Sequence, residues 1–163
     1  MNWEPFVVCS PEDYAPDARG LGSPEGLGDR LRTAAFAERQ AFSAFMWAAE
    51  HLTDASDELR AAWRRIGLEE EMHLNLILGR MAELGVKAEE RPVSDRLWRR
   101  LTETKTALEF SALMRLAEAR GRTAEESFCR SLAQRDPATA AIFGRIAEDE
   151  AEHLALADRL AGR

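Results

Sequence analysis

The sequence of 163 residues has few cysteines and no long apolar segment. Cys9 and Cys129 lie far apart and form no CxxC motif, so we expect both to remain reduced thiols. No apolar run approaches the roughly 20 residues that a membrane-spanning helix needs. The N-terminus also lacks the basic segment and following apolar stretch of a secretory signal. These absences favour a cytoplasmic protein that makes no membrane contact.

Glycine and proline are scarce over most of the chain. They gather before residue 30, near residues 85–92 and at Asp136-Pro137, and the stretches between are rich in Ala, Leu, Glu and Arg. This distribution predicts an all-α protein. The net charge of −7 argues against broad nucleic-acid binding. Local arginine clusters such as Arg64-Arg65 lie among acidic residues, and we interpret them as solvated helix faces.

The turn-forming residues divide the chain into four long predicted helices. Ser23-Pro24 supplies an N-cap and a first-turn proline, and Asp136-Pro137 does the same for the last helix. Gly85 stops the second helix. The four helices are predicted at about residues 24–52, from the polar loop 53–56 to about 84, at 105–133, and from 137 nearly to the C-terminus.

The lengths of the predicted loops indicate how these helices are connected. Short loops join the first pair and the last pair, whereas residues 86–104 form a longer connection with a short helix after Ser94. One long crossover between the second and third helices is typical of one class of four-helix bundle. We expect residues 1–22 to form an irregular N-terminal arm and residues 23–163 to form a single bundle domain.

Two Glu-x-x-His motifs are the first indication of chemistry. They are Glu70–His73 and Glu150–His153, and residues three apart lie on one face of a helix. Each pair can therefore bind the same metal ion. Either motif alone is a weak signal, because 20 of the 163 residues are glutamate.

The spacing of two further glutamates strengthens this signal. Glu38 precedes Glu70 by 32 residues, and Glu118 precedes Glu150 by the same number. The midpoints of both intervals fall in or beside predicted loops, so two antiparallel hairpins bring each pair of carboxylates to one height. We predict that six side chains meet at one level of the bundle as metal ligands. They are Glu38, Glu70, His73, Glu118, Glu150 and His153.

An internal repeat with an offset of 80 residues relates the two predicted hairpins. Arg65-Ile66 recurs as Arg145-Ile146, and Ala37-Glu38 recurs as Ala117-Glu118. The hairpins therefore resemble copies related by a pseudo-twofold axis, with one Glu-x-x-His motif on each side of a metal pair.

The predicted ligands also interrupt apolar stripes that face the core. Glu38 lies between Ala35 and Phe42, and Glu150 follows Phe143 and Ile146 at helical spacing. Burying a charged carboxylate is unfavourable in free energy unless the charge is neutralised. Four carboxylates at one level therefore predict bound cations.

Other ionisable residues receive different interpretations. Glu125 faces inward on the third predicted helix, and we leave open whether it is an alternative ligand or a partner of one. His51 lies near the end of the first helix and is interpreted as a surface residue. Six further glutamates are interpreted as solvated, namely Glu50, Glu58, Glu69, Glu71, Glu148 and Glu152.

Four carboxylates with two imidazoles suit iron or manganese. Glu70 and Glu150 are the natural bridging ligands, and Glu38 and Glu118 are terminal ligands, one for each metal. We therefore expect two iron ions, with manganese or a mixed manganese–iron pair as alternatives, and no catalytic residue beyond the ligands.

The ligand set resembles that of the ferritin-like diiron-carboxylate superfamily, which includes rubrerythrins, bacterioferritins and diiron hydroxylases. The resemblance implies a ferritin-like up-down-down-up four-helix bundle. The segments RGLGSPEGLGDRL, AERQAF, LAEARG and RIAEDEAEH more narrowly resemble an uncharacterised bacterial ferritin-like family that is distantly similar to tRNA-modifying diiron hydroxylases. This similarity covers about residues 19–160.

The resemblance and the motifs together leave several functions open. The first is an oxidoreductase that activates dioxygen or peroxide for a small-molecule substrate, with electrons from an external donor because rubredoxin-like cysteine pairs are absent. Tyr14, the single tyrosine, lies in the arm, which argues against a tyrosyl radical at the site. The alternatives are a ferroxidase or iron-storage protein, a tRNA-modifying hydroxylase, and a metal-free scaffold. Trp47 and Trp63 are candidates either for a homodimer interface or for the core.

Overall fold

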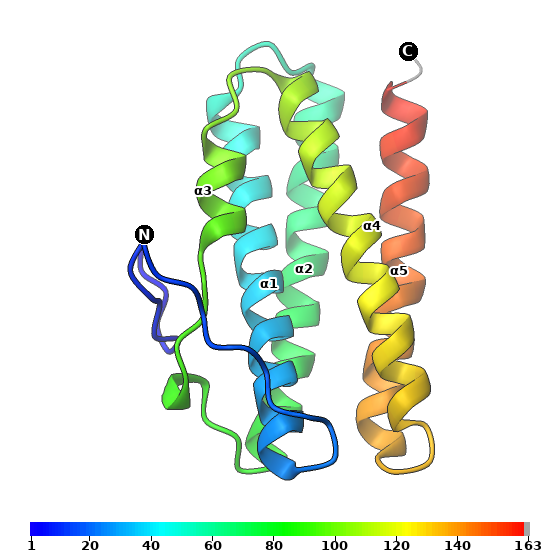
Figure 1. Ribbon diagram of the computed structural model, residues 1–163. Coiled ribbons are helices and arrows are strands. Elements are labelled where there is room, and N and C mark those ends of the chain that lie inside the picture. Colours follow the sequence, from blue (N-terminus) through cyan, green and yellow to red (C-terminus); the bar gives the residue numbers. More distant parts are fainter. Residues whose placement is uncertain (162–163) are drawn as a thin grey trace. The chain divides into compact units, whose positions relative to one another are not determined.

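The computed structural model describes the backbone of residues 1–161 and the side chains of residues 1–155, so residues 162–163 of the predicted bundle segment lie outside it. All long elements are helices, as predicted, and no β-strand occurs among the described residues (Figure 1). None of these helices is long and apolar enough to cross a membrane. The helices are α1 (Pro24–His51), α2 (Asp57–Glu83), the 3-10 turn η1 (Ala88–Glu90), α3 (Arg96–Thr102), α4 (Ala107–Leu132) and α5 (Pro137–Ala161).

The helices begin and end at the capping residues that the sequence analysis identified. The Ser23 hydroxyl accepts a hydrogen bond from the backbone N–H of Gly26 at 3.1 Å, and Asp136 accepts one from the N–H of Thr139 at 3.1 Å. Gly85 follows α2 with a φ of 68°, the left-handed conformation that glycine adopts most easily. Val86 then donates from its N–H to the Met81 carbonyl at 2.8 Å, which ends the helix in a Schellman-type turn.

The chain divides into two compact units. Unit 1 comprises Met1–Trp47 and Gly67–Glu103, and it holds the N-terminal arm, most of α1, the second part of α2 and the crossover with α3. Unit 2 comprises Ala48–Ile66 and the chain from Thr104 onward, and it holds the α1–α2 loop, α4 and α5. The predicted division into an arm and a single bundle domain stays a prediction.

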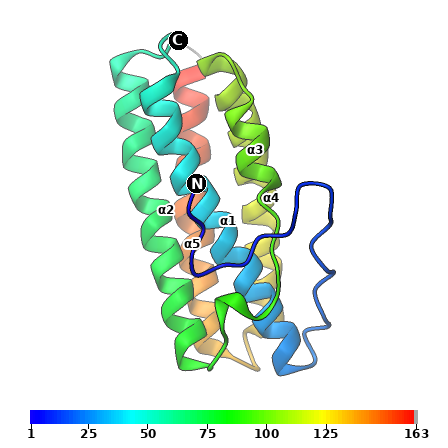
Figure 2. The ribbon, with the colours of Figure 1, turned by 90° about the vertical axis from the view of Figure 1, so that its left-hand side faces the viewer.

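In unit 1, the N-terminal arm and α3 both pack along α1 (Figures 1 and 2). The Trp3 ring makes edge contacts with Phe36 and Trp98, at centroid distances of 5.3 and 5.7 Å. Gln40 on α1 accepts a hydrogen bond from the backbone N–H of Trp98 at 3.0 Å, which satisfies an otherwise open donor at the start of α3. The irregular arm is therefore anchored by aromatic packing.

A buried ionic cluster also joins the arm, α1 and the crossover. Asp29 accepts hydrogen bonds from Arg19 at 2.7 and 2.8 Å and from Arg32 at 3.1 Å, and it also pairs with Arg91. The Arg32 side chain is 1% exposed and binds Glu90 at 3.0 Å. Arg19 most strongly, and then Arg91, hold the pKa of Asp29 well below its usual range. No periodic pattern in the sequence predicted this cluster, because its members come from three separate segments.

In unit 2, α4 and α5 lie side by side and are joined by a short loop (Figures 1 and 2). Phe128 and Phe143 pack edge to face at a centroid distance of 4.7 Å. Trp63 is buried and contacts the Phe110 ring at 5.1 Å, so it belongs to the core, the second of its two predicted roles. Gly121 lies within α4 and does not interrupt the helix.

Candidate metal centre

Unit 1 brings three predicted ligands together. Glu38 comes from α1, and Glu70 and His73 lie one turn apart on α2. All three are buried, and Glu70 and His73 are 0% exposed. The His73 Nδ1 atom lies 3.3 Å from a Glu70 carboxylate oxygen and 4.0 Å from one of Glu38. Each residue thus offers one donor atom to a group that spans less than 4.8 Å.

Unit 2 brings the other three together in the same arrangement. Glu118 comes from α4, and Glu150 and His153 lie one turn apart on α5. The His153 Nδ1 atom lies 3.7 Å from a Glu150 carboxylate oxygen and 4.0 Å from one of Glu118. All three side chains are at least nine-tenths buried. The internal repeat of the sequence is therefore also a repeat of donor geometry.

The donor atoms of each triad have the chemistry and the spacing of a transition-metal site. Imidazole and carboxylate donors bind such ions at about 2.0–2.2 Å, so neighbouring donors around one ion lie about 3.0–3.5 Å apart. The measured 3.3, 3.7 and 4.0 Å are at or slightly above that range. Each triad also buries two carboxylates against one imidazole, which leaves negative charge even when the imidazole is protonated. A bound cation would neutralise it, so the residues fit a metal ion.

Glu125 is buried on α4, as its inward-facing position predicted. A Glu125 carboxylate oxygen lies 3.7 Å from the place where a Cβ on Gly121 would be, so the carboxylate extends over the glycine. Glu125 is not a member of the Glu118 triad. His51 is exposed, and the six glutamates expected to be solvated are exposed or half-buried.

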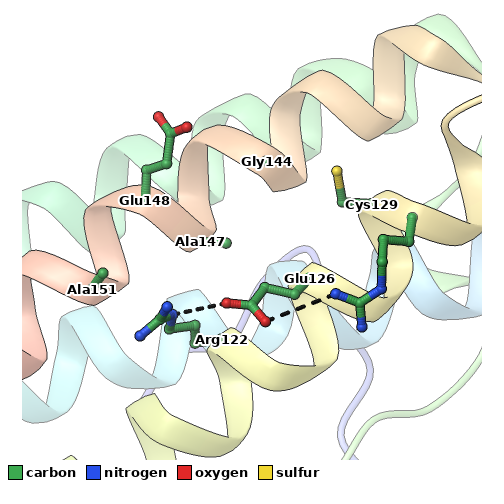
Figure 3. Close-up of a pocket in the computed structure, with 8 residues that line it drawn as sticks. Arg122, Glu126, Cys129, Gly144, Ala147, Glu148 and Ala151 are labelled. Atoms are coloured by element: carbon green, nitrogen blue, oxygen red, sulfur yellow. Dashed lines mark hydrogen bonds and ion pairs between the residues drawn. The ribbon is translucent and has the colours of Figure 1, made fainter.

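A surface pocket of about 320 Å³ lies between α4 and α5 (Figure 3). On α5 it is lined by small residues, including Gly144, Ala147 and Ala151. On α4 the Cys129 thiol lines it, beside Glu126, which pairs with Arg122 at 3.0 Å (Figure 3). Cys129 and Cys9 are both free thiols. None of the six predicted ligands lines this pocket, so it is separate from the Glu118 triad.

Comparison with known protein families places the chain in one of them. Residues 4–160 match the family described as "Protein of unknown function (DUF455)". The chain belongs to the DUF455 family. No curated protein matches it.

Among solved structures, this DUF455 chain is similar to a dodecameric thioferritin, the bacterioferritin-related protein from Bacteroides fragilis. The two share 18% sequence identity with a TM-score of 0.69, and the similarity covers 84% of each chain. This likeness confirms a ferritin-like helical-bundle fold. The buried carboxylate and histidine side chains form donor groups that are compatible with a diiron centre.

Proposed function

We propose that the two triads act together as one dinuclear centre and that this centre holds two iron ions. Three observations support the proposal. The triads repeat each other in residue type, in burial and in the distances around the imidazole nitrogen. The repeat offset of 80 residues is that of a duplicated hairpin. The fold is that of a bacterioferritin-related protein. The observation that carries the proposal is the burial of two carboxylates with one histidine in each triad.

The chain supplies ligands with distinct roles. Glu70 and Glu150 are the proposed bridging ligands, because each shares a helical turn with a histidine. Glu38 and Glu118 are the proposed terminal carboxylates. Two ferrous ions held by these residues would supply two electrons for reduction of dioxygen or peroxide, which would be the basis of an oxidoreductase activity. Ile77 lies one turn after His73 and Phe143 two turns before Glu150, and both are buried, so the ligands come from apolar helix faces.

Residues other than the ligands indicate how such an oxidoreductase would obtain its electrons. The described chain has no CxxC motif, so we propose an external electron donor. Tyr14 is 76% exposed in the N-terminal arm, and it stacks under Arg96 at 4.0 Å. Its position there gives no support to a tyrosyl radical at the centre. We propose that the reaction takes place in the cytoplasm on a small-molecule substrate.

A second candidate function is the handling of iron by a ferroxidase. It is favoured by one finding, the likeness to a protein described as a thioferritin and as related to bacterioferritin. A tRNA-modifying hydroxylase remains an expectation from the resemblance alone, and the net charge of −7 gives it no support.

Anaerobic titration with ferrous iron tests the shared metal proposal. We expect two ions per chain by elemental analysis, and fewer than two in Glu70→Gln/His73→Ala or in Glu150→Gln/His153→Ala, because each variant loses a proposed bridging carboxylate and a histidine. The control variant Glu69→Gln, on the half-buried neighbour of Glu70, should still bind two. A wild-type chain that binds no iron would refute the proposal.

Exposure of the loaded protein to oxygen then separates the two candidate functions. A ferroxidase oxidises iron added well beyond two equivalents per chain and retains the ferric product. An oxidoreductase with a fixed centre stops at two equivalents unless a reductant is present. Near-ultraviolet ferric absorption measured against added iron distinguishes these outcomes.

A further inference from the structure

The outward face of α2 carries a continuous stripe that no described residue covers. Positions 61, 65, 68, 72, 75 and 79 follow one another at steps of four and three, and all six are exposed. The stripe centres on two large apolar side chains, Leu68 at 55% exposure and Met72 at 49%. A four-three spacing along one helix is the pattern that packs against another helix. Small residues, Ala61 and Gly79, occupy its two ends.

The charges on and beside the stripe are arranged with opposite signs on either side of Leu68. Arg64 and Arg65 precede it and are exposed, whereas Glu69 and Glu71 follow it and are half-buried. The charges of this segment are therefore complementary to those of a second copy that runs antiparallel to it. A parallel copy would place like charges together, and a strongly charged partner of either sign would face repulsion from one half of the stripe.

We propose that α2 is a homodimer interface, in which two copies of the helix pair antiparallel about a twofold axis that passes beside Leu68. A 1.5 Å rise per residue puts Arg64 about 6 Å to one side of the axis level and Glu71 about 4.5 Å to the other. The twofold operation therefore brings Arg64 of one copy to the height of Glu71 of the other. At 100° per residue both lie on the same flank of the stripe, so they can form an ion pair twice per dimer.

The rest of the stripe fits the same axis. The two Leu68 side chains meet at the centre and exclude water from each other. Met72 of one copy lies at the height of Arg64 of the other, and the adjacent Arg65 can lay its aliphatic stem along that thioether. Ala61 lies opposite Asn75, so the helices can approach closely at the ends. A single helix pair of this length belongs to the smaller class of interfaces, so we expect a micromolar dissociation constant.

Charge reversal on the full chain tests the proposal. Sedimentation velocity between about 1 and 200 µM should show wild-type dimers that dissociate on dilution. Arg64→Glu and Glu71→Arg should each be monomeric, because each puts two like-charged pairs in the interface. The double variant R64E/E71R should dimerise again, and an equimolar mixture of the two single variants should form heterodimers. Arg120→Glu, on the exposed face of α4, is the matched control and should dimerise like the wild type.

Circular dichroism checks that each variant is folded, which is expected because Glu71 is only half-buried and Arg64 is exposed, with one long hydrogen bond of 3.4 Å to the Ala49 carbonyl. A wild-type chain that stays monomeric at 200 µM would overturn the proposal. So would association that persists unchanged in both single variants, since another face would then be responsible. Iron stoichiometry is measured separately, so failure of the dimer leaves the metal proposal standing and failure of iron binding leaves the dimer standing.

Discussion

The carboxylate of Asp54 accepts hydrogen bonds from the backbone N–H of Ala107, the first residue of α4, at 2.9 and 3.1 Å. Asp54 lies in the loop between α1 and α2, 53 residues away in sequence. The Thr106 hydroxyl caps the same helix from within, through the N–H of Glu109 at 3.2 Å. The loop of the first hairpin thus fixes where α4 begins, and with it the register of Glu118.

Replacing this cap should destabilise the protein by a modest amount. We expect Asp54→Ala to lower the free energy of unfolding by about 1 kcal/mol, since an open helix N-terminus loses both an acceptor and a favourable charge. Asp54→Asn keeps an acceptor and should recover about half of that loss. Urea unfolding followed by circular dichroism measures both values. Equal losses in the two variants would show that hydrogen bonding to Ala107 is not the cause.

The ionic cluster around Asp29 predicts a defined dependence on pH. Asp29→Asn should cost about 2–4 kcal/mol at pH 7, because it removes the shared counter-ion of the buried Arg32 and of the more exposed Arg19 and Arg91. The pKa of Asp29 is lowered in the folded protein by Arg19, so its stabilisation is present above the usual Asp value near 4 and is lost as pH falls below it.

The difference in unfolding free energy between wild type and Asp29→Asn should therefore narrow from pH 5 to pH 2.5. Denaturant titrations at several pH values measure it. Asp17→Asn is the matched control, since its exposed side chain lies near the same cluster and only its backbone carbonyl bonds Arg91. A difference that stays constant with pH would contradict the role of Asp29.

Glu70 should oppose folding in the metal-free protein and favour metal binding. Its fully buried carboxylate lies beside His73 and Glu38, so Glu70→Gln removes a negative charge from the interior. We expect the metal-free variant to unfold at a temperature about 2–4 °C higher, equivalent to about 1 kcal/mol, while affinity for ferrous iron falls at least about tenfold. Differential scanning calorimetry with and without a chelator measures the first effect, and Glu69→Gln should show neither.

Replacing either of two helical glycines by alanine should change the stability of the protein, in opposite directions at the two positions. A Cβ on Gly26 would lie 1.9 Å from the Gly20 carbonyl oxygen, so Gly26→Ala must displace backbone of the N-terminal arm and should cost about 1–3 kcal/mol. A Cβ on Gly79 meets nothing within 4 Å, so Gly79→Ala should stabilise α2 by about 0.5–1 kcal/mol. Thermal unfolding at low protein concentration compares the two. Destabilisation by both would contradict the stabilising effect expected from the open space beside Gly79.

Much of the fold could be read from local sequence signals. The caps at Ser23 and Asp136 and the stop at Gly85 predicted helix ends to within one or two residues for α1, α2 and α5, because these interactions form within a few residues. The predicted start of the third helix at Lys105 was early, since Thr106 supplies the cap and α4 begins at Ala107. The long-range cap from Asp54 had no signal in sequence, because its acceptor and donor meet only after folding.

For the buried charged residues, too, some positions were predicted by the sequence and others were not. Helical periodicity alone predicted that Glu70 and His73 share a face with buried residues, and the repeat predicted an equivalent pair at Glu150 and His153. Periodicity could not predict Arg32 as a buried cation, because a single arginine in an apolar stripe has no local signature of its partners.

The sequence by itself determined which residues lie on helices, which face of each helix is apolar, and where carboxylates and imidazoles interrupt that face. These properties follow from backbone geometry and from spacing along one chain segment. Only the tertiary structure decided which segments supply the partners of a buried charge, as at Asp29, and which interactions fix the start of α4. The physical reason is that burial and ion pairing depend on distances through space between residues that the chain separates by tens of positions.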